Sequence, residues 1–334
     1  MIALDYTQFL TFEPQHHWRI GVAIYLFLGG LGAAIGFLAA MYKHIFKKED
    51  PSMFTWSVLL GVLLVNFGGI FLVMDMFVWE SFLHGHIFEI FKVFLAFFGA
   101  AVFNGNFHPW IMWGANFILW FSVFGTLWAL SQADQAAILK NFGFIRKLAN
   151  VLKPIQAITG WLTLIFAVGV MAYTGFLLSV APSIPAWSHP LLPVLFLISA
   201  LSTGTAWYML WTYFARGKDE RTKELREHIG HQMEWADIAL IGLELIAIGA
   251  YFNYLYYAYA GGKYTFHLML SDIGFVGGFL FLGLIIPWIL EFIAAKVHSM
   301  KVLVPVAAIL VLFGGFLLRY YILHYGIYTY PWPS

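Results

Sequence analysis

The sequence predicts an all-α integral membrane protein that crosses the bilayer eight times, and three observations support this prediction. Of its 334 residues, 61% are hydrophobic and only 10% are charged, which is more apolar side chain than a soluble protein of this length could bury. The apolar residues gather in eight runs, each long enough for a helix to cross a bilayer, which takes about 20 residues. The basic residues concentrate in alternate connecting segments, as is typical of multi-pass proteins.

The eight predicted spans follow one another through the whole chain, 1–334, which we interpret as a single membrane domain. They cover residues 20–42, 55–79, 109–131, 156–180, 189–214, 235–260, 269–295 and 302–325. A shorter apolar segment, "HIFEIFKVFLAFFGAAVF" at 86–103, lies between the second and third spans and contains Glu89 and Lys92. Its length and its charges predict an interfacial or re-entrant helix instead of a ninth span.

Charge predicts the orientation of these spans. With the N-terminus outside, the inner segments are 43–54, 132–155, 215–234 and 296–301. They contain every Lys and Arg of the protein except Arg19, Lys92, Lys263 and Arg319. A ninth span would scatter the basic residues over both sides, so we predict both termini on the outer side of the cell membrane. The first residues lack the pattern of a cleaved signal peptide, and the first span is expected to direct insertion itself.

Composition also excludes some partners and cofactors. The formal net charge of +1 argues against nucleic acid as a partner. The absence of cysteine leaves no thiolate to hold an iron–sulfur cluster of the usual kind. All twelve histidines fall in predicted loops or near span ends, so a haem held by two histidines in mid-membrane is not expected. The sequence therefore predicts no haem, no iron–sulfur cluster and no metal site in this protein.

Two sequence echoes suggest an internal repeat. The first span contains "YLFLGGLGAA" at 25–34 and the fifth contains "VLFLISALSTGTA" at 194–206, while "GFLL" occurs at both 175–178 and 315–318. Both pairs run in the same direction, which predicts two parallel four-helix bundles. The small residues in these stretches are interpreted as sites of close helix packing.

Ionisable residues inside predicted spans are costly, so each is a functional candidate. Asp75 in the second span and Arg319 in the eighth are expected at similar depth near the outer side, where they could form an ion pair that is functional or only structural. Glu244 lies deeper, in the sixth span. Asp237, Asp272 and Glu291 lie near predicted helix ends, where an interfacial position is expected.

Aromatic and polar residues gather at the predicted outer side. His17 and Trp18 open the first span, Tyr25 follows one to two turns deeper, and Tyr173 lies at comparable depth in the fourth. A quinone head group needs hydrogen-bond donors for its carbonyl oxygens and an apolar slot for its tail. Tyrosine or histidine beside an acid such as Asp75 could supply the donors and a proton route.

Several stretches together resemble one family of membrane subunits. They are "YLFLGGLGAA", "FLVMDM", "HPWIMWGANFIL", "AYTGFLLS", "WSHPLLPVLFLISALSTGTA" and "GGFLLRY", spread from about residue 18 to 326. This pattern resembles the NrfD/PsrC family, the membrane subunits of polysulfide reductase and related complexes. The resemblance implies a haem-free anchor that exchanges electrons with menaquinone or another membrane quinone. It also implies quinone contacts at Tyr25 and Tyr173, and quinone binding or proton transfer at Asp75 and Arg319.

The same resemblance implies partners. An iron–sulfur subunit would dock on the outer face and lead to a molybdopterin catalytic subunit, in a complex of the type that reduces sulfur compounds. The protein would then be the quinol-oxidising or quinone-reducing subunit, inactive alone. Two alternatives stay open: a proton translocator in which Glu244, Asp75 and Arg319 form a path, and a purely structural anchor.

Overall fold

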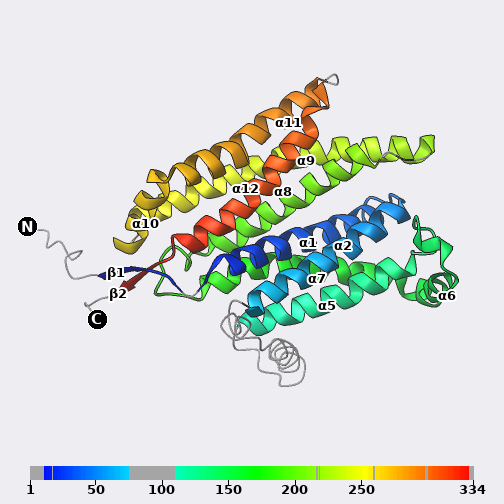
Figure 1. Ribbon diagram of the computed structural model, residues 1–334, viewed down its shortest axis with the longest axis horizontal. Coiled ribbons are helices and arrows are strands. Elements are labelled where there is room, and N and C mark those ends of the chain that lie inside the picture. Colours follow the sequence, from blue (N-terminus) through cyan, green and yellow to red (C-terminus); the bar gives the residue numbers. More distant parts are fainter. Residues whose placement is uncertain are drawn as a thin grey trace, which may run out of the picture.

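The computed structural model describes residues 11–16, 18–74, 110–215, 217, 219–258, 260–297 and 300–330. The predicted interfacial helix at 86–103 lies outside them, as do His17 and Asp75. Within the described residues, eight helices are long and apolar enough to cross a membrane, which confirms the all-α class and the number of spans predicted from the sequence (Figure 1).

The spanning helices are connected by short helices and loops, and a small sheet joins the two ends of the described residues. In chain order the elements are β1 (Thr11–Pro14), α1 (Ile20–His44), α2 (Pro51–Val73), α5 (Trp110–Ser131), η3 (Leu139–Asn141), α6 (Gly143–Leu152), η4 (Lys153–Ile155), α7 (Gln156–Ser179), α8 (Leu191–Phe214), α9 (Glu220–Tyr257), α10 (Ala260–Ser271), η5 (Gly274–Ile285), α11 (Ile286–Lys296), α12 (Leu303–His324) and β2 (Ile327–Tyr330). The segment η5 is a π-helix that continues directly into α11.

Capping residues explain why two helices begin earlier than the apolar runs predict. Asp50 accepts a hydrogen bond from the Met53 amide at 2.9 Å, and Pro51 stands at the first position of α2. Asp219 caps α9 in the same way through the Thr222 amide at 3.0 Å. The charged stretch after Asp219 is therefore helical, and α9 runs for 38 residues without a break.

The helices pack in two neighbouring groups. In the first, α1 contacts α2 and α7, and α5 contacts α2 and α7. In the second, α8 contacts α9 and α12, while α11 contacts α9 and α12, and η5 also packs on α12. Contacts of α1 with α8 and α12, and of α7 with α8, hold the two groups together. The junction between the groups is where the candidate site lies.

Glycines allow the closest helix contacts. A Cβ atom added to Gly61 of α2 would lie 2.4 Å from the carbonyl oxygen of Gly32 in α1. A Cβ atom on Gly283 would lie 2.5 Å from Gly314 Cα, where the π-helix meets α12. Side chains at these positions would force the helices apart, in agreement with the packing role that the sequence predicts for small residues.

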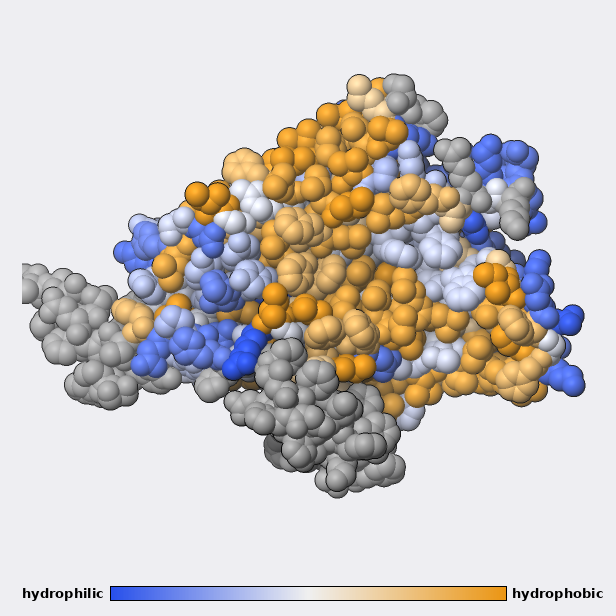
Figure 2. Space-filling model, viewed as in Figure 1, coloured by the Kyte–Doolittle hydropathy of each residue, from blue (hydrophilic) through white to orange (hydrophobic). Residues whose placement is uncertain are grey.

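The two ends of the helix array differ in character. At one end, β1 pairs antiparallel with β2, so the N- and C-terminal parts of the protein lie together; we call this the terminal end (Figure 1). The other end, which we call the basic end, carries the loop 45–50, the segment 132–155 and the start of α9. Hydrophobic residues cover the middle of the visible face and hydrophilic ones gather towards both ends (Figure 2). This distribution fits helices that cross a bilayer.

Asp272 marks the break between α10 and η5. Its Oδ2 accepts a hydrogen bond from Tyr325 Oη at 2.5 Å, and its Oδ1 accepts from the amides of Gly274 at 2.6 Å and Phe275 at 3.3 Å. The Tyr325 hydroxyl, followed by these amides, lowers the pKa of the Asp272 carboxyl below its usual value. The sequence predicts Asp272 near the start of a span that begins at 269; in the structure it lies between two helices, and the spanning segment starts at Gly274.

We expect Tyr325→Phe to lower the stability of the detergent-solubilised protein by about 1 kcal/mol or more at neutral pH, since it removes a hydrogen bond to an ionised group. A depressed folded-state pKa means that this stabilisation is present above the unfolded pKa of about 4 and is lost as the pH falls through the folded value. Thermal unfolding at neutral and acidic pH tests this. A difference between wild type and variant that stays constant down to about pH 3 would contradict it.

Candidate functional site

Arg319 of α12 has no solvent-exposed surface, so its guanidinium faces the interior of the protein. Its Nη1 donates to Gly315 O at 2.5 Å and to Ser199 Oγ at 3.2 Å. Its Nε donates to Leu26 O at 3.2 Å, and its Nη2 donates to Phe196 O at 3.3 Å. These acceptors belong to α1, α8 and α12, so Arg319 connects the two groups of helices.

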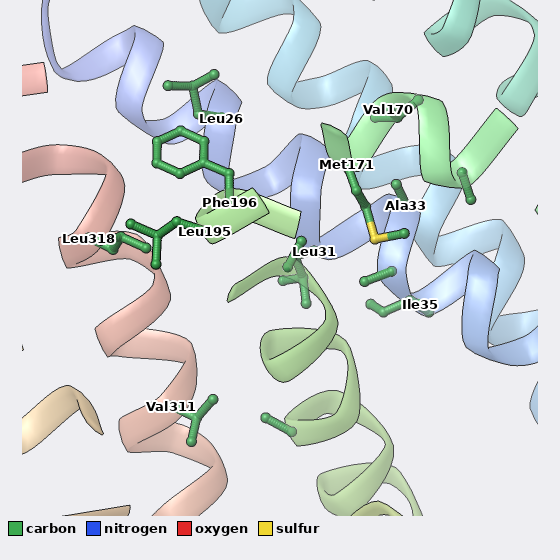
Figure 3. Packing of buried hydrophobic residues seen from close by; sticks show 14 of the residues in the cluster. Leu26, Leu31, Ala33, Ile35, Val170, Met171, Leu195, Phe196, Val311 and Leu318 are labelled. Atoms are coloured by element: carbon green, nitrogen blue, oxygen red, sulfur yellow. The ribbon is translucent and has the colours of Figure 1, made fainter. Parts of the chain in front are cut away.

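Small and aromatic neighbours make room for this charge. A Cβ atom added to Gly30 of α1 would lie 3.1 Å from Arg319 Nη2. Gly30 therefore does more than bring helices together, because it leaves space for the guanidinium. The ring of Phe196 lies 5.2 Å from Arg319 Cζ, a cation–π distance. Figure 3 shows Phe196 with Leu26 of α1 and Leu318 of α12 in the apolar packing at this junction.

Among the described residues, the acid that interacts with Arg319 is Glu244 of α9. Its side chain is buried, and it interacts electrostatically with Arg319. Ser199 lies between them, because its hydroxyl accepts from Arg319 Nη1 and is also a hydrogen-bond partner of Glu244. Among the described residues, Glu244 is thus the candidate counter-charge for the buried arginine. The predicted pair with Asp75 involves a residue outside the described part of the protein and remains a prediction.

Tyr25 of α1 and Tyr173 of α7 meet near the terminal end. Both are about 1% exposed, and their phenol groups interact with each other. The Tyr173 ring occupies the space beside Gly114 of α5, where an added Cβ atom would overlap it. Despite the neighbouring phenol, Tyr25 Oη has no hydrogen-bond partner of good geometry among the described residues. A buried hydroxyl that is left unsatisfied costs free energy, so Tyr25 is a position where a ligand oxygen would be stabilised.

Arg319 approaches the same turn of α1 that carries Tyr25. Its Nε donates to the carbonyl oxygen of Leu26, the next residue in the sequence. The structure therefore brings Tyr25, Tyr173 and Arg319 to one level of the helix array, in the terminal half.

Trp18 belongs to a different environment. It packs on Trp187 with 5.2 Å between ring centroids, and it lines an open cavity of about 420 Å³ at the terminal end. Arg19, Tyr320 and His324 share the lining of this cavity. Trp18 therefore lies beside a cavity that opens to the surface at the terminal end, whereas Tyr25 and Tyr173 are buried.

A second polar cluster was not predicted from the sequence. Asp237 of α9 and Glu291 of α11 were expected at an interface, but neither has any exposed surface. Their carboxyl groups interact, and Thr205 Oγ1 of α8 donates to Asp237 Oδ1 at 2.8 Å. Asp237 Oδ2, both Glu291 carboxyl oxygens and Ser202 Oγ lack a hydrogen-bond partner of good geometry among the described residues. We call Ser202, Thr205, Asp237 and Glu291 the carboxyl cluster.

The antiparallel helices α8 and α9 connect the carboxyl cluster with the Arg319 site. Along α8, Ser199, Ser202 and Thr205 follow one another at three-residue spacing and so share a face. Ser199 contacts Glu244 and Thr205 contacts Asp237. These two contacts set the register of the antiparallel helices α8 and α9. This register places polar groups from the carboxyl cluster to Arg319 along a single seam.

A cavity of about 290 Å³ opens near the basic end of this seam. Its lining includes Glu227, His231 and Glu234 of α9 and Lys301 before α12. His231 Nδ1 lies 3.2 Å from Glu234 Oε2, and the Glu234 side chain is only 5% exposed. Glu234 stands one turn before Asp237 on the same buried face of α9. Glu234 and Asp237 are spaced as residues on one face of a helix. The predicted span begins at 235, so this face could not be recognised from the predicted boundaries.

These observations define a multi-pass α-helical membrane protein with a buried arginine, paired tyrosines and a seam of buried acids. Comparison with known proteins identifies the family. A family model described as "Polysulphide reductase, NrfD" matches residues 10–331, and the protein belongs to this NrfD family.

Three curated proteins are similar over nearly their whole length. "Protein NrfD homolog" of Haemophilus influenzae is 28% identical over 95% of this sequence and 96% of that protein. "Protein NrfD" of Escherichia coli is 29% identical over 93% of this sequence and 95% of its own length. The C subunit of polysulfide reductase from Wolinella succinogenes is 28% identical over 92% and 94%, respectively. These similarities confirm the family that the sequence motifs resemble.

Proposed function

We propose that this protein is the membrane anchor subunit of a respiratory oxidoreductase complex and exchanges electrons and protons with a membrane quinone beside Tyr25 and Tyr173. The observation that carries the proposal is the pair of enclosed phenols, of which the Tyr25 hydroxyl has no hydrogen-bond partner of good geometry among the described residues. A phenol in apolar surroundings can donate a hydrogen bond to a carbonyl oxygen and can hold a proton. Arg319 at the same level supplies fixed positive charge near the site.

The residues fit a quinone head group. Tyr25 Oη would donate to a quinone oxygen, and Tyr173 would support it from the neighbouring helix. A bound quinone supplies two-electron, two-proton redox chemistry. The protein's part is to position the head group, exclude water and provide a proton route at the phenols. Asp75 and His17, which the sequence places near this site, would complete its polar side.

The partners and the orientation follow from the same proposal. The sequence has no cysteine, so thiolate-held clusters that deliver electrons must belong to another subunit. One relative is named as the C subunit of polysulfide reductase, which implies further subunits in its complex. We propose iron–sulfur and molybdopterin subunits at the terminal end of this protein, with that end outside the cell membrane. The basic end would face the cytoplasm.

The experiment is to purify the intact complex, extract it with organic solvent and measure both quinone content and quinol-dependent turnover. We expect quinone in the extract after mild solubilisation, and turnover that a quinone-site inhibitor abolishes. A complex that reduces its acceptor from an artificial donor, but carries no quinone and shows no quinol-dependent turnover, would contradict the proposal and favour a structural anchor.

The seam of buried acids favours a second function, proton movement between the basic end and the quinone site. Two carboxyl groups side by side in an apolar interior cannot both be ionised at low cost, so Asp237 and Glu291 would share a proton. The cavity at Glu234 opens one turn away, and Glu244 stands between the carboxyl cluster and Arg319. Together they offer successive proton carriers along the seam.

We expect Asp237→Asn together with Glu291→Gln to abolish proton uptake from the basic side during turnover. Both substitutions keep the shape of the side chain and a hydrogen-bonding group, so the complex should assemble. Proteoliposomes carrying a pH-sensitive dye measure the proton movement. Glu220→Gln, at the exposed start of α9, is the matched control and should behave as wild type. Unchanged proton uptake in the double variant would contradict the proton route without affecting the quinone proposal.

A further inference from the structure

A concave surface at the basic end lies outside the seam and outside the proposed quinone site. It has a volume of about 480 Å³ and forms where the loop after α1 meets the first turns of α9, at the right of Figure 1. Its lining residues come from both segments. They are Lys47, Lys48, Glu49, Arg221, Glu224, Leu225 and His228. We call this surface the basic pocket.

The charge of the basic pocket favours an anion. Lys47, Lys48 and Arg221 are permanent cations at physiological pH. Of the two acids in the lining, Glu49 forms an ion pair with Lys43, 3.2 Å away and not part of the lining. Glu224 is then the one remaining acid in the lining, so the three cations outnumber it. A phosphate group, which presents several acceptor oxygens, matches such a set of donors.

The backbone of the pocket is held in an uncommon conformation. Lys47 has φ of 55°, in the left-handed region that residues other than glycine seldom adopt. The bend is fixed on both sides, because the amide of Phe46 donates to Met41 O at 3.2 Å and that of Lys48 donates to Tyr42 O at 2.9 Å. Such a conformation costs about 1 kcal/mol or more, and it is retained here at a lysine and not a glycine.

A partly buried ion pair connects the two segments that form the pocket. Arg226 Nε of α9 donates to Asp50 Oδ2 at 2.7 Å, and Arg226 Nη1 donates to Ala215 O at 2.6 Å. Asp50 is also the cap of α2. The loop that carries Lys47 and Lys48 is therefore fastened to the helix that carries Arg221, so the pocket is preformed.

Apolar side chains adjoin the cations in the sequence. Ile45 and Phe46 are each about half exposed and directly precede Lys47, and the Phe46 ring packs on Tyr42 at 5.2 Å between centroids. They stand where α1 ends, which is the level at which a spanning helix leaves the hydrocarbon region. Cations beside exposed apolar groups at this level suit a lipid, whose phosphate and acyl chains are joined in one molecule.

We propose that the basic pocket binds the phosphate of an anionic phospholipid, with the acyl chains against Ile45 and Phe46. A free phosphate ion shares the head-group chemistry, but it would make no use of the apolar neighbours. The proposal is independent of quinone exchange and of proton movement, since none of the residues of those sites lines the pocket.

The test compares two triple variants by native mass spectrometry after release from phosphatidylethanolamine vesicles containing phosphatidylglycerol. Lys47→Asn, Lys48→Gln and Arg221→Gln remove the pocket's cations, and asparagine tolerates the left-handed backbone at 47. We expect phosphatidylglycerol retention to weaken about fivefold for each removed charge. The control removes the same number of exposed charges at the basic end through Lys140→Gln, Arg146→Gln and Lys147→Gln, and it should retain the lipid as wild type does.

Two results would overturn the proposal. Equal loss of phosphatidylglycerol in both triple variants would show only general attraction between a basic surface and anionic lipid. Displacement of the lipid from wild-type protein by inorganic phosphate, tested in vesicles of the same composition, would identify a free-phosphate site. Thermal unfolding of each variant confirms that it is folded, and the single variant Lys48→Gln provides the same comparison if the triple variant does not assemble.

Discussion

The variant Tyr25→Phe is expected to lower quinol-dependent turnover of the intact complex about 100-fold while leaving the protein as stable as wild type or slightly more stable. The reason lies in the Tyr25 hydroxyl, which is fully buried yet has no hydrogen-bond partner of good geometry within the described structure. Removing an unsatisfied buried hydroxyl relieves a cost of folding. If the same hydroxyl binds quinone, its removal also deprives the substrate of a donor and a proton carrier. Steady-state turnover with a quinol and thermal unfolding in detergent measure the two effects.

Tyr251→Phe is the matched control, and it should show the opposite pattern. Tyr251 is equally buried, but its Oη donates to Ala186 O at 2.7 Å. Losing this bond should cost about 1 kcal/mol of stability and leave turnover within a few-fold of wild type. The quinone assignment would fail if Tyr25→Phe and Tyr173→Phe both kept full turnover in an assembled complex. It would also fail if the Tyr25 variant lost stability and not activity.

The spanning helices could be predicted from the sequence because length and hydropathy are local properties. A run of about 20 apolar residues has few alternatives to a spanning helix, so the number of spans did not depend on tertiary contacts. The inward direction of Arg319 could also be predicted, because a guanidinium facing lipid is costly. Which acid would neutralise it depended on how α9 packs on α8, and that register is a tertiary property.

The burial of Asp237 and Glu291 could not be predicted from the sequence. The predicted sixth span began at 235, which placed Asp237 at a helix end, whereas α9 begins at Glu220 and carries Asp237 deep inside. Polar helix formers and the Asp219 cap extend this helix beyond its apolar part, so hydropathy alone set the boundary too late. The neighbour of Glu291 is Asp237, which lies on another helix, so this contact is a tertiary property. The three-residue spacing of Ser199, Ser202 and Thr205 can be read from the sequence. That these hydroxyl groups face Glu244 and Asp237 is evident only from the structure.

Arg319→Met is expected to have the largest effect on stability, because it leaves Glu244 buried without a counter-charge. Breaking one partner of a buried ion pair typically costs about 3–5 kcal/mol. Arg319→Lys should recover part of this loss by restoring the charge. It should not recover all of it, since an ammonium group cannot reproduce a fork that reaches Leu26, Phe196 and Ser199 at once.

A double-mutant cycle decides whether Glu244 is the partner. Glu244→Gln removes the charge that Arg319→Met leaves unpaired, so the double variant should be more stable than Arg319→Met alone, with a coupling free energy of about 1–3 kcal/mol. Unfolding in detergent supplies the four free energies. Strict additivity would show that Arg319 is neutralised elsewhere, and Asp75 would then be the next partner to test. A positive coupling together with lost proton uptake in Glu244→Gln would mean that the group holding Arg319 in place also passes protons along the seam.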